Sequence, residues 1–122
     1  MKTATLHIGV HRIKFDEPML WSVSLIVRAC IRFRLPWPAE VRVTGAKGYV
    51  GECDPEKLVI RIRKPKGKGA ERPEEQLDTL AHELAHLRHF EHTIDHEALT
   101  KRIMIWWLVS TPILFAWSTP RA

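Results

Sequence analysis

The sequence predicts a small α+β domain. Two stretches, residues 40–44 and 57–63, alternate apolar and polar side chains, as strands with one buried face do. Two others, 17–33 and 73–89, carry apolar residues at helical spacing. The 122 residues are 45% hydrophobic and 27% charged, which is ordinary for a folded protein, and this length allows one modest core. We therefore expect a single domain over residues 1–122.

The chain is expected to begin with one strand and one helix. Residues 3–13 alternate in polarity, which indicates a strand. Residues from about 17 to 33 are expected to form the helix, because the arginines near their end complement the partial negative charge of a helix C-terminus. The segment Pro36-Trp37-Pro38 then ends the helix, because proline cannot continue it.

The middle of the chain is expected to complete a three- or four-stranded sheet. A glycine-rich segment, TGAKGYVGECDPEK, joins the two strand-like runs. Within it, Tyr49 and Val50 predict a short strand, and Asp54-Pro55-Glu56-Lys57 has the composition of a turn. Residues 64–73 are polar and basic, and they predict an exposed loop that leads to the next helix.

Five of the seven histidines lie in one string, HELAHLRHFEHTIDH, over residues 82–96. Its helix is expected to begin near Pro73, with acidic residues in the first turn. Four residues apart on a helix, His82 and His86 project side by side and can bind one zinc ion. Glu83 is then placed to reach a water molecule at the metal. A helical wheel puts these histidines opposite the apolar face, which consists of Leu77, Leu80, Ala81, Leu84 and Leu87.

A catalytic zinc ion usually has three protein ligands and one open position. If the helix ends around His89, the chain can turn and bring His92 back beneath the metal. His89 itself lies two turns from His82 on a straight helix, which places it out of reach. The spacing therefore favours His92 as the third ligand and leaves His96 and Glu97 as alternatives.

The motif HELAHLRHFEH resembles the HELxHL-x4-H pattern of the small zincin-like metallopeptidases, in particular the YgjP-like and SprT-like groups. Specific matching is concentrated in residues 80–92, and beyond them TIDHEALTKR replaces an aromatic-containing segment of those relatives. The resemblance implies a minimal zincin-like fold with an N-terminal helix, a small sheet, an active-site helix and a C-terminal helix. It also implies His82, His86 and His92 as zinc ligands and Glu83 as the catalytic acid and base.

These residues together predict a zinc-dependent metallopeptidase. Zinc lowers the pKa of a bound water towards about 7, and Glu83 would take the proton of that water and deliver it to the leaving amine. A protein or peptide substrate is expected to lie along the exposed sheet edge. Asp78 is a candidate to orient His82. The donor to the oxyanion is left open among His89, His96, Arg88 and Tyr49.

The alternative is a non-catalytic, zinc-stabilised binding module associated with DNA or a membrane surface. A net charge of +5 favours acidic partners, and six lysines and arginines lie between Arg61 and Arg72. This basic 61–72 segment is a candidate for DNA contact, although no aromatic stacking platform accompanies it. Glu83 favours the enzyme, because a purely structural zinc site has no need of a general base.

Two further features concern location. Residues 103–120 carry no charge but are interrupted at Ser110-Thr111-Pro112, so we expect a buried closing helix and an apolar tail, with membrane or partner contact as the alternative. Cys30 and Cys53 are too few for a disulfide framework, and no apolar signal segment precedes Arg12. Both observations favour a cytoplasmic protein with reduced thiols.

Overall fold

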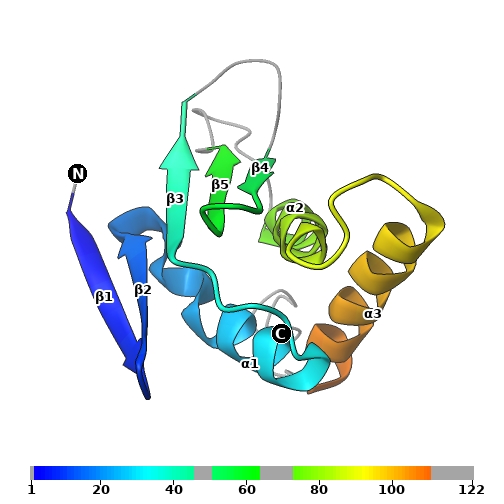
Figure 1. Ribbon diagram of the computed structural model, residues 1–122, viewed down its shortest axis with the longest axis horizontal. Coiled ribbons are helices and arrows are strands. Elements are labelled where there is room, and N and C mark those ends of the chain that lie inside the picture. The colour runs from blue at the N-terminus through cyan, green and yellow to red at the C-terminus, as the bar shows by residue number, and fades with distance from the viewer. Residues whose placement is uncertain (1, 46–50, 64–72, 111–122) are drawn as a thin grey trace, which may run out of the picture.

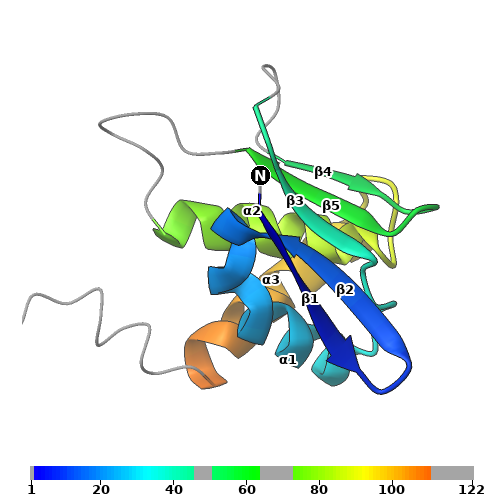
Figure 2. The ribbon, with the colours of Figure 1, turned by 90° about the vertical axis from the view of Figure 1, so that its left-hand side faces the viewer.

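The computed structural model describes residues 2–45, 51–63 and 73–110. These residues form a five-stranded sheet and three α-helices, which confirms the α+β prediction (Figure 1). The sheet order is β1-β2-β3-β5-β4, and the helices lie on one side of β3, β5 and β4 (Figure 2). The strands are β1 (Thr3–Ile8), β2 (His11–Asp16), β3 (Glu40–Thr44), β4 (Gly51–Asp54) and β5 (Val59–Arg63).

The first predicted strand, residues 3–13, is in fact an antiparallel hairpin of β1 and β2. Ile8 pairs with His11, so Gly9 and Val10 form a two-residue turn. Gly9 has a φ of 57°, which glycine adopts without a steric penalty. The alternation of polarity runs on through the turn, and for this reason the sequence did not reveal it. The expectation of three or four strands was therefore too low.

The predicted helix from residue 17 to 33 is divided into two parts. Residues Glu17–Ser22 form a 3-10 helix, and α1 (Val23–Phe33) follows it. The Ser22 hydroxyl donates a hydrogen bond to the Met19 carbonyl, 2.6 Å away, at the junction. The end of α1 agrees with the prediction, because Arg34 takes a left-handed conformation just before the proline-containing segment.

The centre of the sheet is parallel, and its β4 edge is antiparallel. β3 pairs in parallel with both β2 and β5, while β4 pairs antiparallel with β5. The predicted strand at Tyr49 and Val50 falls outside the described residues, and the observed strand begins at Gly51. The predicted turn after β4 is confirmed, since the Asp54 carboxylate accepts hydrogen bonds from the main-chain N–H groups of Glu56 and Lys57.

α2 (Pro73–His86) closes the core beneath this sheet. The apolar face of α2 is buried as predicted, and α2 contacts both β4 and β5. The expectation that this helix ends around His89 was wrong: it ends at His86, where Leu87 and Arg88 form hydrogen bonds to the third residue before them.

The C-terminal helix, α3 (Ile94–Ser110), packs on both α2 and α1. Its Trp107 is fully buried and donates its indole N–H to the Leu25 carbonyl, 3.0 Å away. The part of the predicted closing helix up to residue 110 therefore lies in α3, and residues 111–120 fall outside the described chain. Within the described ranges no helix is both long enough and apolar enough to cross a membrane.

Candidate metal centre

Three imidazoles converge where α2 ends and the chain turns back. His82 and His86 lie one turn apart on α2, and the turn after α2 returns His92 to them. The His82 and His86 Nε2 atoms are 3.2 Å apart, and the Nε2 atom of His92 lies 3.1 Å from each of them. The three nitrogens therefore form a nearly equilateral triangle.

This triangle is not explained by hydrogen bonding among the rings. The Nδ1 atom of His86 lies 2.9 Å from the His89 carbonyl oxygen, to which it donates, so in the neutral ring Nε2 carries a lone pair. Each imidazole Nε2 offers one site in its ring plane, so three of them cannot satisfy one another pairwise. Convergent lone pairs of this kind become favourable when a cation lies between them.

The protonation state of His82 and His86 suits metal binding. Burial, together with the positive charges of His96, His86 and His92, lowers the pKa of His82 to about 4, and the negative charge of Asp78 opposes this effect. Burial also lowers the pKa of His86, against the raising effect of its hydrogen bond to His89. Both rings are neutral at pH 7, which is the form that binds a metal.

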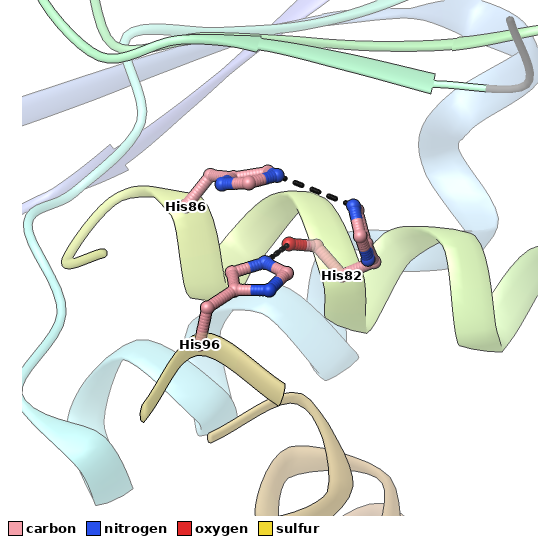
Figure 3. A group of neighbouring side chains, drawn as sticks. All are labelled: His82, His86 and His96. Atoms are coloured by element: carbon pink, nitrogen blue, oxygen red, sulfur yellow. Dashed lines mark hydrogen bonds between the residues drawn. The ribbon is translucent and has the colours of Figure 1, made fainter. Parts of the chain in front are cut away.

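A fourth histidine lies against this pair. The ring nitrogens of His82, His86 and His96 lie within 4.8 Å of one another, close enough to bind a metal ion. The His96 ring is buried and stacks on the His86 ring, with centroids 4.0 Å apart and 21° between the planes. Its Nε2–H donates to the His82 carbonyl oxygen, 3.0 Å away (Figure 3).

Glu83 is a buried carboxylate beside the histidines. It follows His82 on α2, is only 4% exposed, and lines the same cleft as His82 and His86. Burial, with a smaller effect from the negative charge of Glu52, raises the pKa of Glu83 to about 7. A carboxyl group with a pKa near 7 can both accept and donate a proton at neutral pH.

A glycine that sequence reasoning did not single out sets the distance between β4 and Glu83. A Cβ atom on Gly51 would lie 2.7 Å from Glu83 Oε2 and 2.8 Å from Thr79 Cγ2. Only glycine allows this approach without a shift of the neighbours. The signal available in the sequence was a glycine within the segment that precedes the second strand-like run.

An open cleft of about 610 Å³ lies over the histidines, beside the edge strand β4. A second hollow, of about 350 Å³, lies on the α3 side and shares Asp78, His82 and His92 with the first. The cleft is lined by Gly51, Glu52, Cys53, Pro55, Asp78, Thr79, His82, Glu83, His86, Phe90 and His92.

The residues considered for the oxyanion have other contacts. Arg88 donates hydrogen bonds to the carbonyls of Phe33 and Arg34 at the end of α1. His96 donates to the main chain of α2, His89 accepts at its carbonyl, and Tyr49 falls outside the described residues. Of the three candidates that the structure describes, Arg88, His89 and His96, none lines the cleft beside Glu83.

Other expected participants are placed as follows. Glu97, an alternative ligand, forms an ion pair with Lys101 at 3.2 Å. Asp78 is exposed and lines both hollows. In the basic segment, Arg61 pairs with Glu52 at 3.3 Å and residues 64–72 are not described.

The two cysteines are free thiols. Burial raises the pKa of Cys30 to about 12, and burial together with Glu83, Asp54 and Glu52 does the same for Cys53. Neither thiol is therefore a ready nucleophile at neutral pH. In comparisons with known proteins, no family model, curated protein or solved structure matches this chain.

Proposed function

We propose that this protein is a zinc-dependent peptidase, with His82, His86 and His92 as zinc ligands and Glu83 as the catalytic acid and base. The observation that carries the proposal is the triangle of three Nε2 atoms, with sides of 3.1 to 3.2 Å. With zinc–nitrogen bonds of about 2.0 to 2.1 Å, such a triangle corresponds to nitrogen–zinc–nitrogen angles of about 100°, close to tetrahedral. Three ligands leave the fourth position for water or substrate.

His92 fits the role of third ligand better than His96 does. A metal ion bound to His86 lies in the plane of that ring, in line with its Nε2 lone pair. The His96 ring is stacked on His86, so its own lone pair runs nearly parallel to that plane instead of towards the metal. His96 instead suits a supporting role, because it fixes the main chain of His82 and the ring of His86.

Glu83 supplies the proton transfer. A bound zinc ion would make water nucleophilic near neutral pH and would polarise a carbonyl group. In its ionised form Glu83 accepts a proton from the attacking water, and in its protonated form it donates that proton to the leaving amine. A pKa of about 7 gives both forms at neutral pH.

The proposed substrate is an extended segment of protein or peptide. β4 is the outermost strand on its side of the sheet, and its Gly51–Cys53 stretch lines the cleft beside Glu83. A peptide added to this edge would form main-chain hydrogen bonds, which hold an extended chain without selecting its sequence. Its scissile carbonyl would then pass over the three histidines.

The decisive experiment compares the wild-type protein with Glu83→Gln, a substitution of nearly equal shape. Zinc per chain is measured by elemental analysis, and cleavage is followed on casein and on a mixed peptide library. We expect one zinc per chain in both proteins and a loss of cleavage of about 10²- to 10⁴-fold in Glu83→Gln, the range of general acid–base catalysis.

Two results would decide against this assignment. Equal cleavage by both proteins would remove Glu83 from the mechanism. Stoichiometric zinc without cleavage of any peptide by the wild-type protein would favour the non-catalytic binding module.

A further inference from the structure

The last two turns of α3 expose apolar side chains. Ile105 is 59% exposed, Val109 is 72% exposed and Leu108 is 39% exposed, although the opposite face of the same helix buries Ile103 and Trp107 completely. Arg102, Ile105 and Val109 share one face, because they are three and four residues apart. α3 is therefore apolar on its core side and again on the exposed face of its last two turns.

Positive charge surrounds this apolar end. The guanidinium group of Arg32, on α1, lies 5.0 Å from the ring centre of Trp106, and that of Arg28 lies 5.9 Å from it. A hollow of about 390 Å³ between the two helices is lined by Arg32, Phe33, Arg102, Ile105 and Trp106. We call these five residues, with Leu108 and Val109, the α1–α3 patch.

The sequence around the patch carries no negative charge. Residues 18–39, which include α1, contain no aspartate or glutamate, and neither do residues 98–122. Within these two stretches the only charged side chains are lysines and arginines. The overall net charge of +5 does not by itself require both stretches to lack carboxylates. The patch is therefore cationic because of its local composition.

We infer that the α1–α3 patch docks this protein on the surface of an anionic membrane. Apolar side chains inserted at the level of the headgroups, with arginines beside them and a tryptophan between, are the features by which helices bind lipid interfaces. Anionic lipid headgroups supply the charge that the patch lacks.

The position of the patch leaves the metal centre accessible. His96 lies near the start of α3, whereas Ile105 and Val109 lie nine and thirteen residues further along the same helix. At about 1.5 Å per residue this separates them from His96 by about 14 to 20 Å. Docking through the C-terminal end of α3 would therefore hold the cleft away from the bilayer and open to a substrate.

The test measures co-sedimentation of the full chain with vesicles of phosphatidylcholine alone and of phosphatidylcholine with phosphatidylglycerol. We expect binding to the anionic vesicles that weakens with salt. Arg102→Gln should weaken it about fivefold, the effect of one cation near a charged surface. Ile105→Asp should weaken it at least as much. Val10→Asp, at the 94% exposed hairpin turn, is the matched control and should bind like the wild type.

Circular dichroism shows whether each variant is folded. If Ile105→Asp does not fold, Arg102→Gln, a substitution at an exposed position, still tests the inference. Equal binding to both kinds of vesicle, or to neither, would overturn the inference. So would anionic binding that Arg102→Gln and Ile105→Asp leave unchanged. Sedimentation velocity completes the test. If the wild-type protein is a dimer that does not bind vesicles, and Ile105→Asp is a monomer, a second copy of the chain occupies the patch and the inference is overturned.

Discussion

The imidazole of His96 donates a hydrogen bond to the carbonyl oxygen of His82, 3.0 Å away, while its ring stacks on His86. His92 instead approaches both rings through its Nε2 atom. Two histidines four residues apart in sequence thus contact the same pair in different ways. This difference underlies our proposal that His96 supports the site and that His92 is the third ligand.

The first prediction separates these two roles. His92→Ala should abolish stoichiometric zinc binding, because it removes one corner of the nitrogen triangle. His96→Gln should weaken zinc binding by about 10- to 100-fold and keep the stoichiometry, as loss of a supporting contact does. Competition with a chromophoric chelator measures both. His89→Ala is the control, since His89 contacts His86 through its main chain and not its ring.

The assignment of ligands would be reversed by the opposite pattern, in which His96→Gln loses stoichiometric zinc and His92→Ala retains it. In that case the stacked ring would have to rotate when the metal binds.

The second prediction concerns Gly51. In Gly51→Ala the new methyl group would meet Glu83 Oε2 at 2.7 Å and Thr79 at 2.8 Å, so the carboxylate must move. We expect kcat/KM for peptide cleavage to fall by about tenfold to a hundredfold, the effect of displacing a catalytic group by about 1 Å. Zinc content should stay at the wild-type level. Gly45→Ala is the matched control, because a Cβ there meets no atom within 4 Å.

Unchanged cleavage by Gly51→Ala, with Gly45→Ala also unchanged, would mean that the place of Glu83 beside β4 does not matter for the reaction. A loss of zinc in Gly51→Ala would instead show that the substitution disturbs the ligands themselves.

The third prediction uses the pKa of Glu83, which burial raises from 4.5 to about 7. Below pH 4.5 the carboxyl group is protonated in both the folded and the unfolded chain, and between pH 4.5 and 7 the folded chain holds the extra proton. The contribution of this group to stability is therefore lost as the pH rises through about 7. The ionised group is destabilising above that pH in the metal-free protein.

At pH 8, the free energy of unfolding of metal-free Glu83→Gln should accordingly exceed that of the metal-free wild type by on the order of 2 kcal/mol. The variant should therefore unfold at a higher temperature. The two proteins should be nearly equal at pH 5. The shifts of His82 and His86 act in the opposite direction, since their lowered pKa values make stability rise with pH, but both proteins share them. Thermal unfolding at the two pH values measures the difference, and a gap that does not grow with pH would contradict the assignment.

The fourth prediction concerns Arg88, whose guanidinium group donates hydrogen bonds to the carbonyls of Phe33 and Arg34. These contacts join the end of α1 to the turn that carries His92. Arg88→Gln should lower the free energy of unfolding by about 1 kcal/mol and should weaken zinc binding, because the turn loses an anchor. Arg12→Gln, at an exposed position of the hairpin, is the control.

Denaturant unfolding and chelator competition measure the two effects of Arg88→Gln separately. Lower stability with unchanged zinc affinity would limit the role of Arg88 to the end of α1.

The parts of the site that were predictable lie on one helix. The spacing of His82 and His86 fixes their relation once residues 73–86 are helical, and the buried leucines follow from the same periodicity. The position of His92 depends on where α2 ends, and that end lies at His86 and not around His89. The tertiary contact of Arg88 with α1, which holds the turn beyond it, has no signature in local sequence.

The sheet was less predictable for a similar reason. The polarity of residues 3–13 alternates through the turn at Gly9, so one strand and a hairpin give the same pattern. The role of Gly51 arises only when β4 is packed against α2, which no local pattern reveals. Propensity and spacing therefore predicted the elements, while the contacts between distant segments determined the details of the site.

The three converging imidazoles come from eleven consecutive residues, His82 to His92. The contact of Arg88 with the end of α1 anchors the turn, but the three rings themselves are joined by a short loop, so the entropy lost in bringing them together is small. We expect a partly folded chain that retains the end of α2 and the following turn to keep part of its affinity for the ion. Metal would therefore raise the melting temperature by less than its affinity for the native protein implies, since some of that affinity survives unfolding.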